Sequence, residues 1–234
     1  MFKKGKGRDA GVRAAEAGRL FSRPGVVESD APAGLQRLGL GQGKDGLVYV
    51  PVNYTRERPA PLALMLHGAG GDAGQGISLI REFADERGLI LLALDSRRMT
   101  WDVIEGGYGP DVSFIDAALA QTFGRYSIDA GRVAAGGFSD GASYALSLGL
   151  TNGDLFTHVL AFSPGFAAPA ALVGAPRLFV SHGTRDRVLP VNVCGRQVVK
   201  QVREAGYDVE YMEFEGTHAV PGEVARAGVE WFLK

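Results

Sequence analysis

Hydrophobic residues in this chain gather in short, nearly continuous runs, and longer segments with helical periodicity separate these runs. Strands buried on both faces of a parallel sheet have this appearance, because neither face of such a strand needs polar residues. The alternation predicts a doubly wound α/β domain with helices on both faces of the sheet. The runs cover residues 61–66, 88–94, 132–138, 158–162 and 177–180, and the helical segments cover 75–87, 110–123, 141–150, 190–205 and 221–233.

Two further patterns complete the predicted sheet. Residues 35–40 and 47–52 are short alternating segments on either side of a glycine-rich turn at 41–46, which predicts an antiparallel hairpin. Residues 208–214 alternate less regularly and are expected to form the last strand. The sheet should therefore be mostly parallel, with an N-terminal antiparallel hairpin at one edge.

Proline positions and one short connection refine this prediction. Pro190 and Pro221 each fit the first turn of the helix that follows, where a missing N–H costs nothing. The connection between Phe162 and Arg177 is too short to hold a helical cap over the sheet. We therefore expect a single domain over residues 31–234 without a large cap domain.

The residues before this domain, 1–30, are expected to form a basic N-terminal extension. Residues 1–23 contain seven lysines and arginines against Asp9 and Glu16, a net charge of +5. The segment lacks the apolar core of a secretory signal, and no stretch of the chain reaches membrane-spanning length. We expect a solvated extension with a short helix around residues 10–20, a cytoplasmic protein and no integral membrane segment.

Composition and charge exclude several other classes of protein. A net charge of -1 over 234 residues gives no global reason to expect a nucleic-acid partner. The single cysteine, Cys194, rules out an internal disulfide and a thiol-rich metal site. It is expected to be a structural thiol, because no glycine-flanked turn and no nearby base frame it. Oligomeric state cannot be inferred from the sequence.

The most informative segment is the pentapeptide from Gly137 to Gly141, which lies between a predicted strand and a predicted helix. A serine with glycines two residues away on each side can occupy a sharp strand-to-helix turn, where a Cβ at the glycine positions would collide with the neighbouring backbone. Such a turn presents the Oγ of Ser139 to a substrate. The amide of Asp140, at the start of the next helix, would then point toward developing negative charge.

Because 34 of the 234 residues are glycine, this pentapeptide alone is weak evidence, and its context carries more weight. Ligands in open α/β sheets bind beyond the carboxyl ends of the strands. Three further loops at such ends carry polar side chains: 67–71, 181–186 and 216–218. A serine needs an imidazole to accept its proton, and the imidazole needs a carboxylate to fix its tautomer. Serine, acid and histidine should follow in that order along the chain.

The four histidines can be separated by position. His67 lies in the glycine loop before the nucleophile, where a structural hydrogen bond is expected. His158 begins a strand and should be an edge or core residue. His182 closes a strand just before the candidate acid and is expected to support it. Only His218 follows that acid and ends the last strand, so it is the candidate base.

The candidate acid is Asp186. Asp208 starts a strand and therefore lies at the wrong end of the sheet, and Asp95 ends a strand that precedes the nucleophile. The sequence thus predicts a catalytic triad of Ser139, Asp186 and His218.

With these motifs in place, residues 34–234 resemble the α/β-hydrolase superfamily. The chain is most similar to its small carboxylesterase/phospholipase branch, with affinities to dienelactone-hydrolase-like and poly(3-hydroxybutyrate)-depolymerase-like esterases. The resemblance implies a serine carboxylesterase that acts through an acyl-enzyme on small-molecule esters, with no metal or organic cofactor. It also implies that Ala69 and Asp140 supply the two oxyanion-hole amides.

A cysteine nucleophile is absent from the turn, which argues against dienelactone hydrolysis itself. The motifs that carry the resemblance are 66–71, 137–142, 182–190 and 216–218.

Trp101 and Gly70 are the residues expected to contact the substrate. Gly70 lies in the predicted oxyanion loop, and Trp101 follows a strand end, where it would either form a wall of the substrate pocket or be buried in the core. Without a cap, the site should be open and shallow and should favour short acyl groups. Lysophospholipid, thioester and polyester substrates remain alternatives within the same fold.

Two other functions stay open. Residues 68–73 formally match a G-x-G-x-x-A dinucleotide fingerprint, and Asp95 stands where a ribose-binding acid would be expected. That interpretation leaves three catalytic candidates unexplained. A hydrolase-fold binding protein without activity is the second alternative, although such proteins usually lose a catalytic residue.

Overall fold

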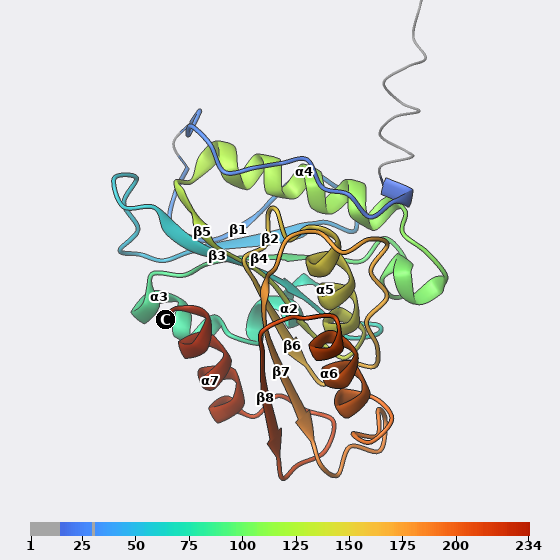
Figure 1. Cartoon of the computed structure of the whole chain (residues 1–234). Coiled ribbons are helices and arrows are strands. Elements are labelled where there is room, and N and C mark those ends of the chain that lie inside the picture. The colour runs from blue at the N-terminus through green and yellow to red at the C-terminus, as the bar shows by residue number, and fades with distance from the viewer. Residues whose placement is uncertain (1–14, 30) are drawn as a thin grey trace, which may run out of the picture.

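The computed structural model describes residues 15–29 and 31–234, which form an eight-stranded sheet flanked by helices (Figure 1). The strand order across the sheet is β1-β2-β4-β3-β5-β6-β7-β8. The strands are β1 (Gly34–Arg37), β2 (Gly46–Val50), β3 (Ala60–Leu66), β4 (Ile90–Leu94), β5 (Ile128–Phe138), β6 (His158–Phe162), β7 (Arg177–Gly183) and β8 (Val209–Phe214).

Pairing in the sheet changes from antiparallel to parallel at β4. β2 pairs antiparallel with both β1 and β4, whereas every pairing from β4 through β8 is parallel. The predicted fold class, including the N-terminal hairpin, is therefore confirmed. The parallel strands all run in one direction, so the loops after β3, β5, β7 and β8 lie at one edge of the sheet.

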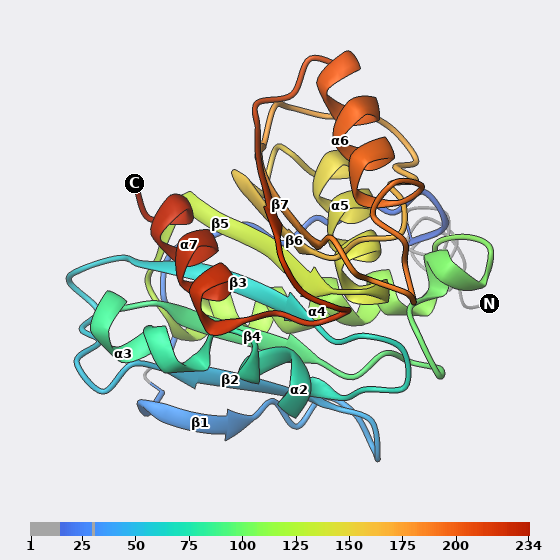
Figure 2. The ribbon, with the colours of Figure 1, turned by 90° about the horizontal axis from the view of Figure 1, so that it is seen from below.

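Helices cover both faces of the sheet, as the apolar runs require. On one face pack α4 (Pro110–Arg125), α5 (Asp140–Thr151) and α6 (Gly195–Glu204). The opposite face carries α2 (Ala73–Ser78), α3 (Ala84–Arg87) and α7 (Gly222–Phe232) (Figures 1 and 2). Two short 3₁₀ helices, η1 (Arg81–Phe83) and η2 (Asp102–Glu105), complete the described elements.

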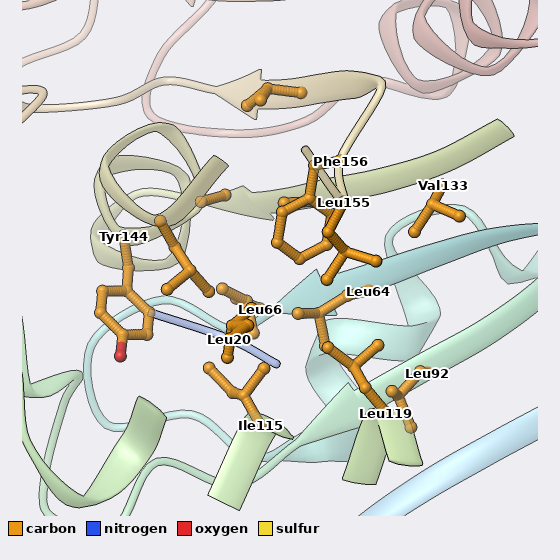
Figure 3. Packing of buried hydrophobic residues seen from close by; sticks show 14 of the residues in the cluster. Leu20, Leu64, Leu66, Leu92, Ile115, Leu119, Val133, Tyr144, Leu155 and Phe156 are labelled. Carbon is orange, nitrogen blue, oxygen red and sulfur yellow. The ribbon is translucent and has the colours of Figure 1, made fainter. Parts of the chain in front are cut away.

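The larger of the two hydrophobic clusters lies between the sheet and the α4–α5 face. Leu64 and Leu66 of β3 meet Ile115 and Leu119 of α4 there, all with no exposed surface (Figure 3). Burial of such side chains contributes roughly 1.5–3 kcal/mol each relative to exposure. The central strands and α5, which carry the candidate nucleophile, are thus held in the most deeply buried part of the molecule.

The single helix predicted over residues 75–87 is divided into α2, η1 and α3. Ile80 interrupts it, with φ -138° and ψ 12° outside the helical range. The segment begins with glycines, which favour helix weakly. Gly76 also lies so close to β3 that a Cβ there would approach the carbonyl oxygen of Met65 to 2.6 Å. The conformation of this segment is therefore determined more by its packing against the sheet than by the helix propensity of its residues.

The predicted helix start at Pro190 is wrong, because α6 begins at Gly195. The amides of Val193 and Cys194 both donate to the carbonyl of Pro190, which closes an isolated turn. Cys194 then leaves the helical region with φ -116° and ψ -90°. Pro221 stands one residue before α7, as its N-cap, rather than inside the first turn.

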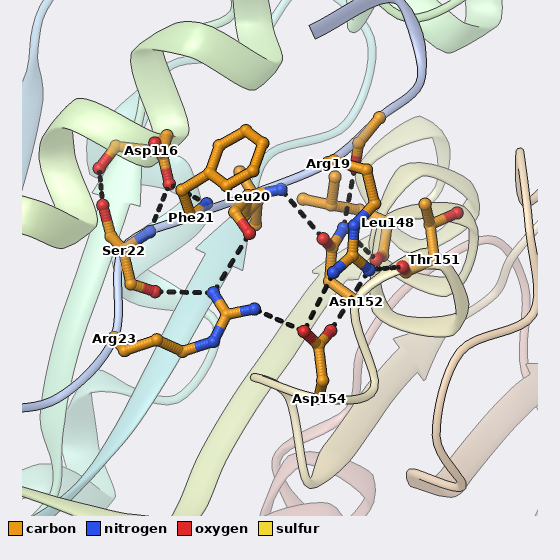
Figure 4. Close-up of polar contacts among 11 residues, drawn as sticks. Arg19, Leu20, Phe21, Ser22, Arg23, Asp116, Leu148, Thr151, Asn152 and Asp154 are labelled. Atoms are coloured by element: carbon orange, nitrogen blue, oxygen red, sulfur yellow. Dashed lines mark hydrogen bonds and ion pairs between the residues drawn. The ribbon is translucent and has the colours of Figure 1, made fainter. Parts of the chain in front are cut away.

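Residues 15–29 do not form a solvated extension. Leu20 is fully buried within the larger cluster, and its amide donates to the side chain of Asn152. The amides of Phe21 and Ser22 both donate to Asp116 of α4 (Figure 4). The expectation of a solvated extension is therefore wrong for Leu20 and the backbone that packs beside it, whereas Phe21, Val26 and other side chains of the segment are exposed. The rest of the predicted extension, including most of the short helix expected at 10–20, lies outside the described residues.

Basic side chains of the same segment are tied to the end of α5. Arg19 and Arg23 both form ion pairs with Asp154, at 2.9 and 2.5 Å (Figure 4). Arg19 also donates to the carbonyl oxygen of Thr151. Two of the seven basic residues counted in the sequence are therefore used in internal contacts.

No helix among residues 15–29 and 31–234 has the length and hydrophobicity needed to cross a bilayer. The connection between β6 and β7, residues 163–176, is described in full and contains no helix. The edge of the sheet where the candidate residues lie is therefore not covered by a helical cap from this connection, as predicted.

Candidate active site

Ser139 occupies a strained turn between β5 and α5. Its φ of 58° and ψ of -120° lie in a region that residues with a side chain seldom adopt. The turn is held because the Ser139 amide donates to the carbonyl of Phe162, and the Ser139 carbonyl accepts from the amides of Ala142 and Ser143. The predicted strand–turn–helix context of the serine is therefore present.

The two flanking glycines are required by close backbone contacts. A Cβ at Gly137 would lie 2.6 Å from backbone atoms of Gly141 and from the carbonyl oxygen of Leu66. A Cβ at Gly141 would lie 2.2 Å from that same oxygen and 2.5 Å from the carbonyl oxygen of His67. The glycines therefore let the turn press directly against the end of β3, which carries the predicted oxyanion loop.

The three residues of the predicted triad lie in hydrogen-bond contact. The Oγ of Ser139 is 2.9 Å from Nε2 of His218, and Nδ1 of His218 is 2.6 Å from Oδ2 of Asp186. These side chains are 79 and 32 residues apart along the chain and come from the loops after β5, β8 and β7. Their catalytic role stays a prediction, but the geometry permits the hydroxyl proton to pass to the imidazole.

Asp186 is held in place by the chain that follows it. Its Oδ1 accepts hydrogen bonds from the amides of Val188 and Leu189, both at 2.9 Å, and its side chain has no exposed surface. Burial alone would raise the pKa of this carboxyl. The amide of Leu189 and the imidazole of His218 outweigh that effect, so the pKa lies below its usual value. Asp186 is therefore an anion at neutral pH.

A second imidazole faces the same carboxylate. The Nε2 of His182 lies 2.7 Å from the carbonyl oxygen of Leu189 and 3.3 Å from Oδ2 of Asp186, and this side chain is fully buried. His218, in contrast, keeps 14% of its side-chain surface exposed. His182 thus braces the Asp186 loop, as expected of a supporting residue, while only His218 also contacts the serine.

The predicted oxyanion loop, residues 67–71, packs beside the nucleophile. A Cβ at Gly68 would come within 3.4 Å of the Cβ of Ser139. The loop's own backbone bonds use the amides of Gly70, which donates to Met99, and Gly71, which donates to Gly68. The Ala69 amide takes no part in these bonds. Asp140 is the first residue of α5, so its N–H has no acceptor inside the helix. Both amides predicted for the oxyanion hole are therefore available as donors.

His67 has the structural role expected from the sequence. It is almost completely buried, its Nε2 accepts from the amide of Ser96 at 3.1 Å, and its Nδ1 lies 2.7 Å from the carbonyl oxygen of Gly68. This arrangement requires a neutral ring with the proton on Nδ1. Burial lowers the pKa of His67, in agreement with a ring that stays neutral.

Trp101 does not form a wall of the substrate pocket. It has no exposed surface, and its indole Nε1 donates to the carbonyl oxygen of His67 at 2.9 Å. Its ring stacks on Tyr144 of α5, with centroids 5.3 Å apart. Of the two alternatives left by the sequence, the buried core residue is correct. Substrate contact by Gly70, which is exposed and has a φ of 68°, stays a prediction.

A cavity lies beside Phe138, the residue that precedes Ser139. It measures about 330 Å³ and is lined by Leu79, Phe138, Val220 and neighbouring polar residues. The Phe138 ring contacts the ring of His218, with centroids 4.6 Å apart. The cavity is open and small, and its lining combines apolar side chains with Ser78 and Glu82.

Sequence reasoning missed a pair of buried carboxylates beside the site. Asp111 accepts the amides of Arg97 and Asp102, at 2.6 and 2.8 Å, and Asp102 accepts the amide of Asp111 in return, at 3.0 Å. Burial raises the pKa of Asp111 to about 6, and the nearby charge of Asp102 acts in the same direction. No local motif marks this pair, since the contact depends on how η2 meets α4.

Asp95, the acid that a dinucleotide-binding site would use, makes structural hydrogen bonds instead. Asp95 uses Oδ1 to accept the amide of Ala73 and Oδ2 to accept the amide of Asp45, both at 2.8 Å. Both oxygens thus join the start of α2 to the turn before β2, which gives Asp95 a structural role. Over the described part of the chain, no three His, Cys, Asp or Glu side chains are grouped to hold a metal ion.

Known proteins resemble this chain in sequence and in structure. The sequence profile of the phospholipase/carboxylesterase family matches residues 112–229. NocK of Nocardia uniformis subsp. tsuyamanensis, a protein assigned as an esterase, is 31% identical over 141 residues, which are 56% of this chain and 41% of NocK. The match therefore spans about two fifths of the length of that relative.

Two solved structures illustrate the structural similarity. Esterase PE8 superposes with a TM-score of 0.66 at 20% identity, over 80% of this chain and 97% of its own. The Bacillus cereus carboxylesterase superposes with a TM-score of 0.60 at 20% identity, over 81% of this chain and 93% of its own. At these identities the likeness establishes the α/β-hydrolase fold and leaves the substrate open.

Proposed function

Because this chain belongs to the phospholipase/carboxylesterase family, a family of hydrolases that act on ester bonds, we propose that it is a serine carboxylesterase for small or short-acyl esters. The observation that carries the proposal is the continuous hydrogen-bonded contact from Ser139 through His218 to Asp186. A buried, ionised carboxylate and an imidazole in contact with a strained serine are what nucleophilic acyl transfer requires.

In the proposed first step, the Oγ of Ser139 attacks the ester carbonyl carbon while Nε2 of His218 takes the hydroxyl proton. Asp186 stabilises the imidazolium that results and keeps its Nδ1 proton in place. The carbonyl π electrons move onto the oxygen, which the amides of Ala69 and Asp140 would stabilise. Each such donor contributes on the order of 3–4 kcal/mol to the transition state.

The tetrahedral intermediate then collapses. His218 returns its proton to the departing alcohol, the carbon–oxygen bond breaks, and an acyl group remains on Ser139. Water attacks this acyl-enzyme with His218 again as the base, which releases the carboxylic acid and restores the serine. The residues named here carry every proton transfer in the cycle.

The absence of a helical cap from the connection between β6 and β7 supports short acyl groups as substrates. A lysophospholipase, a thioesterase or a polyester hydrolase would use the same triad and differ in the groups bound around it. We also keep the prediction from the sequence that the protein acts in the cytoplasm.

A panel of p-nitrophenyl esters with acyl chains from acetyl to palmitoyl tests the proposal. The wild-type protein should hydrolyse them fastest at short chain length. Ser139→Ala should lower turnover by about 10⁴-fold or more, because the nucleophile is lost. A profile that peaks at long acyl groups would contradict the substrate class, and a Ser139→Ala variant with normal turnover would contradict the mechanism.

A further inference from the structure

The loop that leads from β4 into η2, residues 96–101, contacts both halves of the predicted oxyanion hole. Three of its bonds go to the oxyanion loop: the Ser96 amide donates to Nε2 of His67, the Met99 carbonyl accepts from the Gly70 amide, and the Trp101 indole donates to the His67 carbonyl. These bonds hold His67 before Ala69 and Gly70 after it. We call residues 96–101 the bridge loop.

The fourth contact goes to the nucleophile turn. The hydroxyl of Thr100 donates to Oδ2 of Asp140 at 2.7 Å, from a half-buried position. Asp140 is the residue whose amide is predicted to be the second oxyanion donor, and its carboxylate is attached one residue from the nucleophile. One short loop thus contacts His67 and Gly70 on either side of one donor, and it contacts the residue of the other donor through a single side chain.

The carboxylate of Asp140 also needs to be restrained for an electrostatic reason. A negative charge near a developing oxyanion opposes its formation, and the opposition grows in surroundings with little water. A hydrogen bond from Thr100 fixes the direction of this carboxylate and offsets part of its charge. Without that bond the side chain could rotate toward the reacting carbonyl.

The bridge loop is itself anchored, so it can act as a rigid support. The amides of Arg97 and Asp102, at either end of the loop, both donate to the carboxylate of Asp111. Lys44 donates to the carbonyl of Ser96 at 2.8 Å and also contacts the carbonyl of Arg98. A loop fixed at both ends transmits little motion to the groups it touches.

From these contacts we propose that Thr100 is a positioning residue, which orients Asp140 so that its amide, together with that of Ala69, stabilises the oxyanion. The proposal rests on the proposed esterase function. It concerns the transition state only, so loss of the Thr100 hydroxyl should lower kcat and leave KM nearly unchanged.

The test compares Thr100→Val, which removes the hydroxyl at similar volume, with Thr100→Ser, which keeps it. With a short-chain p-nitrophenyl ester, Thr100→Val should lower kcat by about tenfold, a fraction of the effect of losing a whole donor. Thr100→Ser should restore most of the activity. Thr122→Val is the matched control, because the Thr122 hydroxyl is also buried but bonds only to Ala118 within α4. It should change stability without changing kcat.

A reversible trifluoromethyl ketone inhibitor separates positioning from general damage. Ser139 Oγ bonds to its carbonyl carbon, the π pair moves to the oxygen, and the hydroxyl proton passes to His218, so the adduct contains an oxyanion. Its inhibition constant should rise about tenfold in Thr100→Val. The corresponding alcohol, which cannot form this adduct, should bind the variant and the wild type equally. Equal inhibition constants of the ketone for both proteins would overturn the proposal.

A double-mutant cycle with Asp140→Ala tests the named contact. If Thr100 acts through the Asp140 carboxylate, the double variant should be no slower than the slower single variant. Multiplicative losses would overturn the proposal. Should Thr100→Val fold poorly, Thr100→Ala provides a second readout, since it removes the same hydroxyl and should show the same reduction of kcat. A wild-type protein without esterase activity would instead refute the proposed function, whereas an active wild type with an unaffected Thr100→Val would refute only this role of Thr100.

Discussion

Asp186 and Asp111 are both buried carboxylates that accept two backbone N–H groups, yet their pKa values move in opposite directions. Burial raises the pKa of each. At Asp186 the Leu189 amide and the His218 imidazole outweigh burial, and the pKa falls. At Asp111 burial dominates, the neighbouring Asp102 adds to it, and the pKa rises to about 6. Equal numbers of backbone donors therefore do not give equal ionisation.

The difference separates a chemical role from a structural one. Asp186 stays ionised at neutral pH beside an imidazole that can carry positive charge, as the proposed mechanism requires. Asp111 joins the bridge loop to the start of α4 through backbone amides, and its neighbour is another carboxylate. The charge of the neighbouring side chain, a carboxylate at Asp111 and an imidazole at Asp186, distinguishes the two sites.

The largest expected difference between the two sites is in catalysis. Asp186→Asn should lower kcat by about 10⁴-fold, because an amide cannot stabilise the imidazolium and can favour the wrong tautomer of His218. Asp111→Asn should lower kcat by no more than about tenfold, since it acts only through the bridge loop. Steady-state kinetics on a short-chain ester would measure both. Similar losses in the two variants would show that the comparison is wrong.

A smaller effect should appear in the pH dependence of stability. Between about pH 4 and about pH 6 the folded protein holds a proton on Asp111 that the unfolded chain has lost, so the free energy of unfolding falls as pH rises. A shift of this size corresponds to about 2–3 kcal/mol across the interval. Asp186, with its lowered pKa, acts in the opposite sense: its contribution is present above its usual pKa and is lost as pH falls below it.

Urea unfolding at several pH values can resolve these two slopes. Asp111→Asn should remove the decline between about pH 4 and about pH 6, and Asp186→Asn should remove the loss at lower pH. The absolute stability of Asp111→Asn should also fall, because one amide NH₂ would face a backbone N–H. The slope is therefore the informative quantity. An unchanged slope in Asp111→Asn would contradict the raised pKa.

The same contrast explains what the sequence could predict. Several features of the fold and the site have local sequence signals. These are the strand–helix alternation, the positions of Ser139, Asp186 and His218 after strands, and the glycines at 137 and 141. The parallel sheet then brings distant strand ends to one edge without further information.

Features that depend on contact between distant segments were not predictable in this way. The burial of Leu20 comes from its contact with the end of α5, and no pattern in the neighbouring sequence indicates it. Trp101 follows a strand end whether it faces solvent or the core, and only the packing against His67 and Tyr144 decides between the two. The bond between Thr100 and Asp140 joins residues 40 positions apart and has no sequence signature.

The central claim is that Ser139 is the nucleophile of a serine hydrolase, and covalent labelling tests it most directly. The protein would be treated with a fluorophosphonate probe, digested and examined by peptide mass spectrometry, beside the Ser139→Ala variant. We expect one adduct per chain, located on Ser139, and none in the variant. An unlabelled wild-type protein, or an adduct on another residue that persists in Ser139→Ala, would contradict the account.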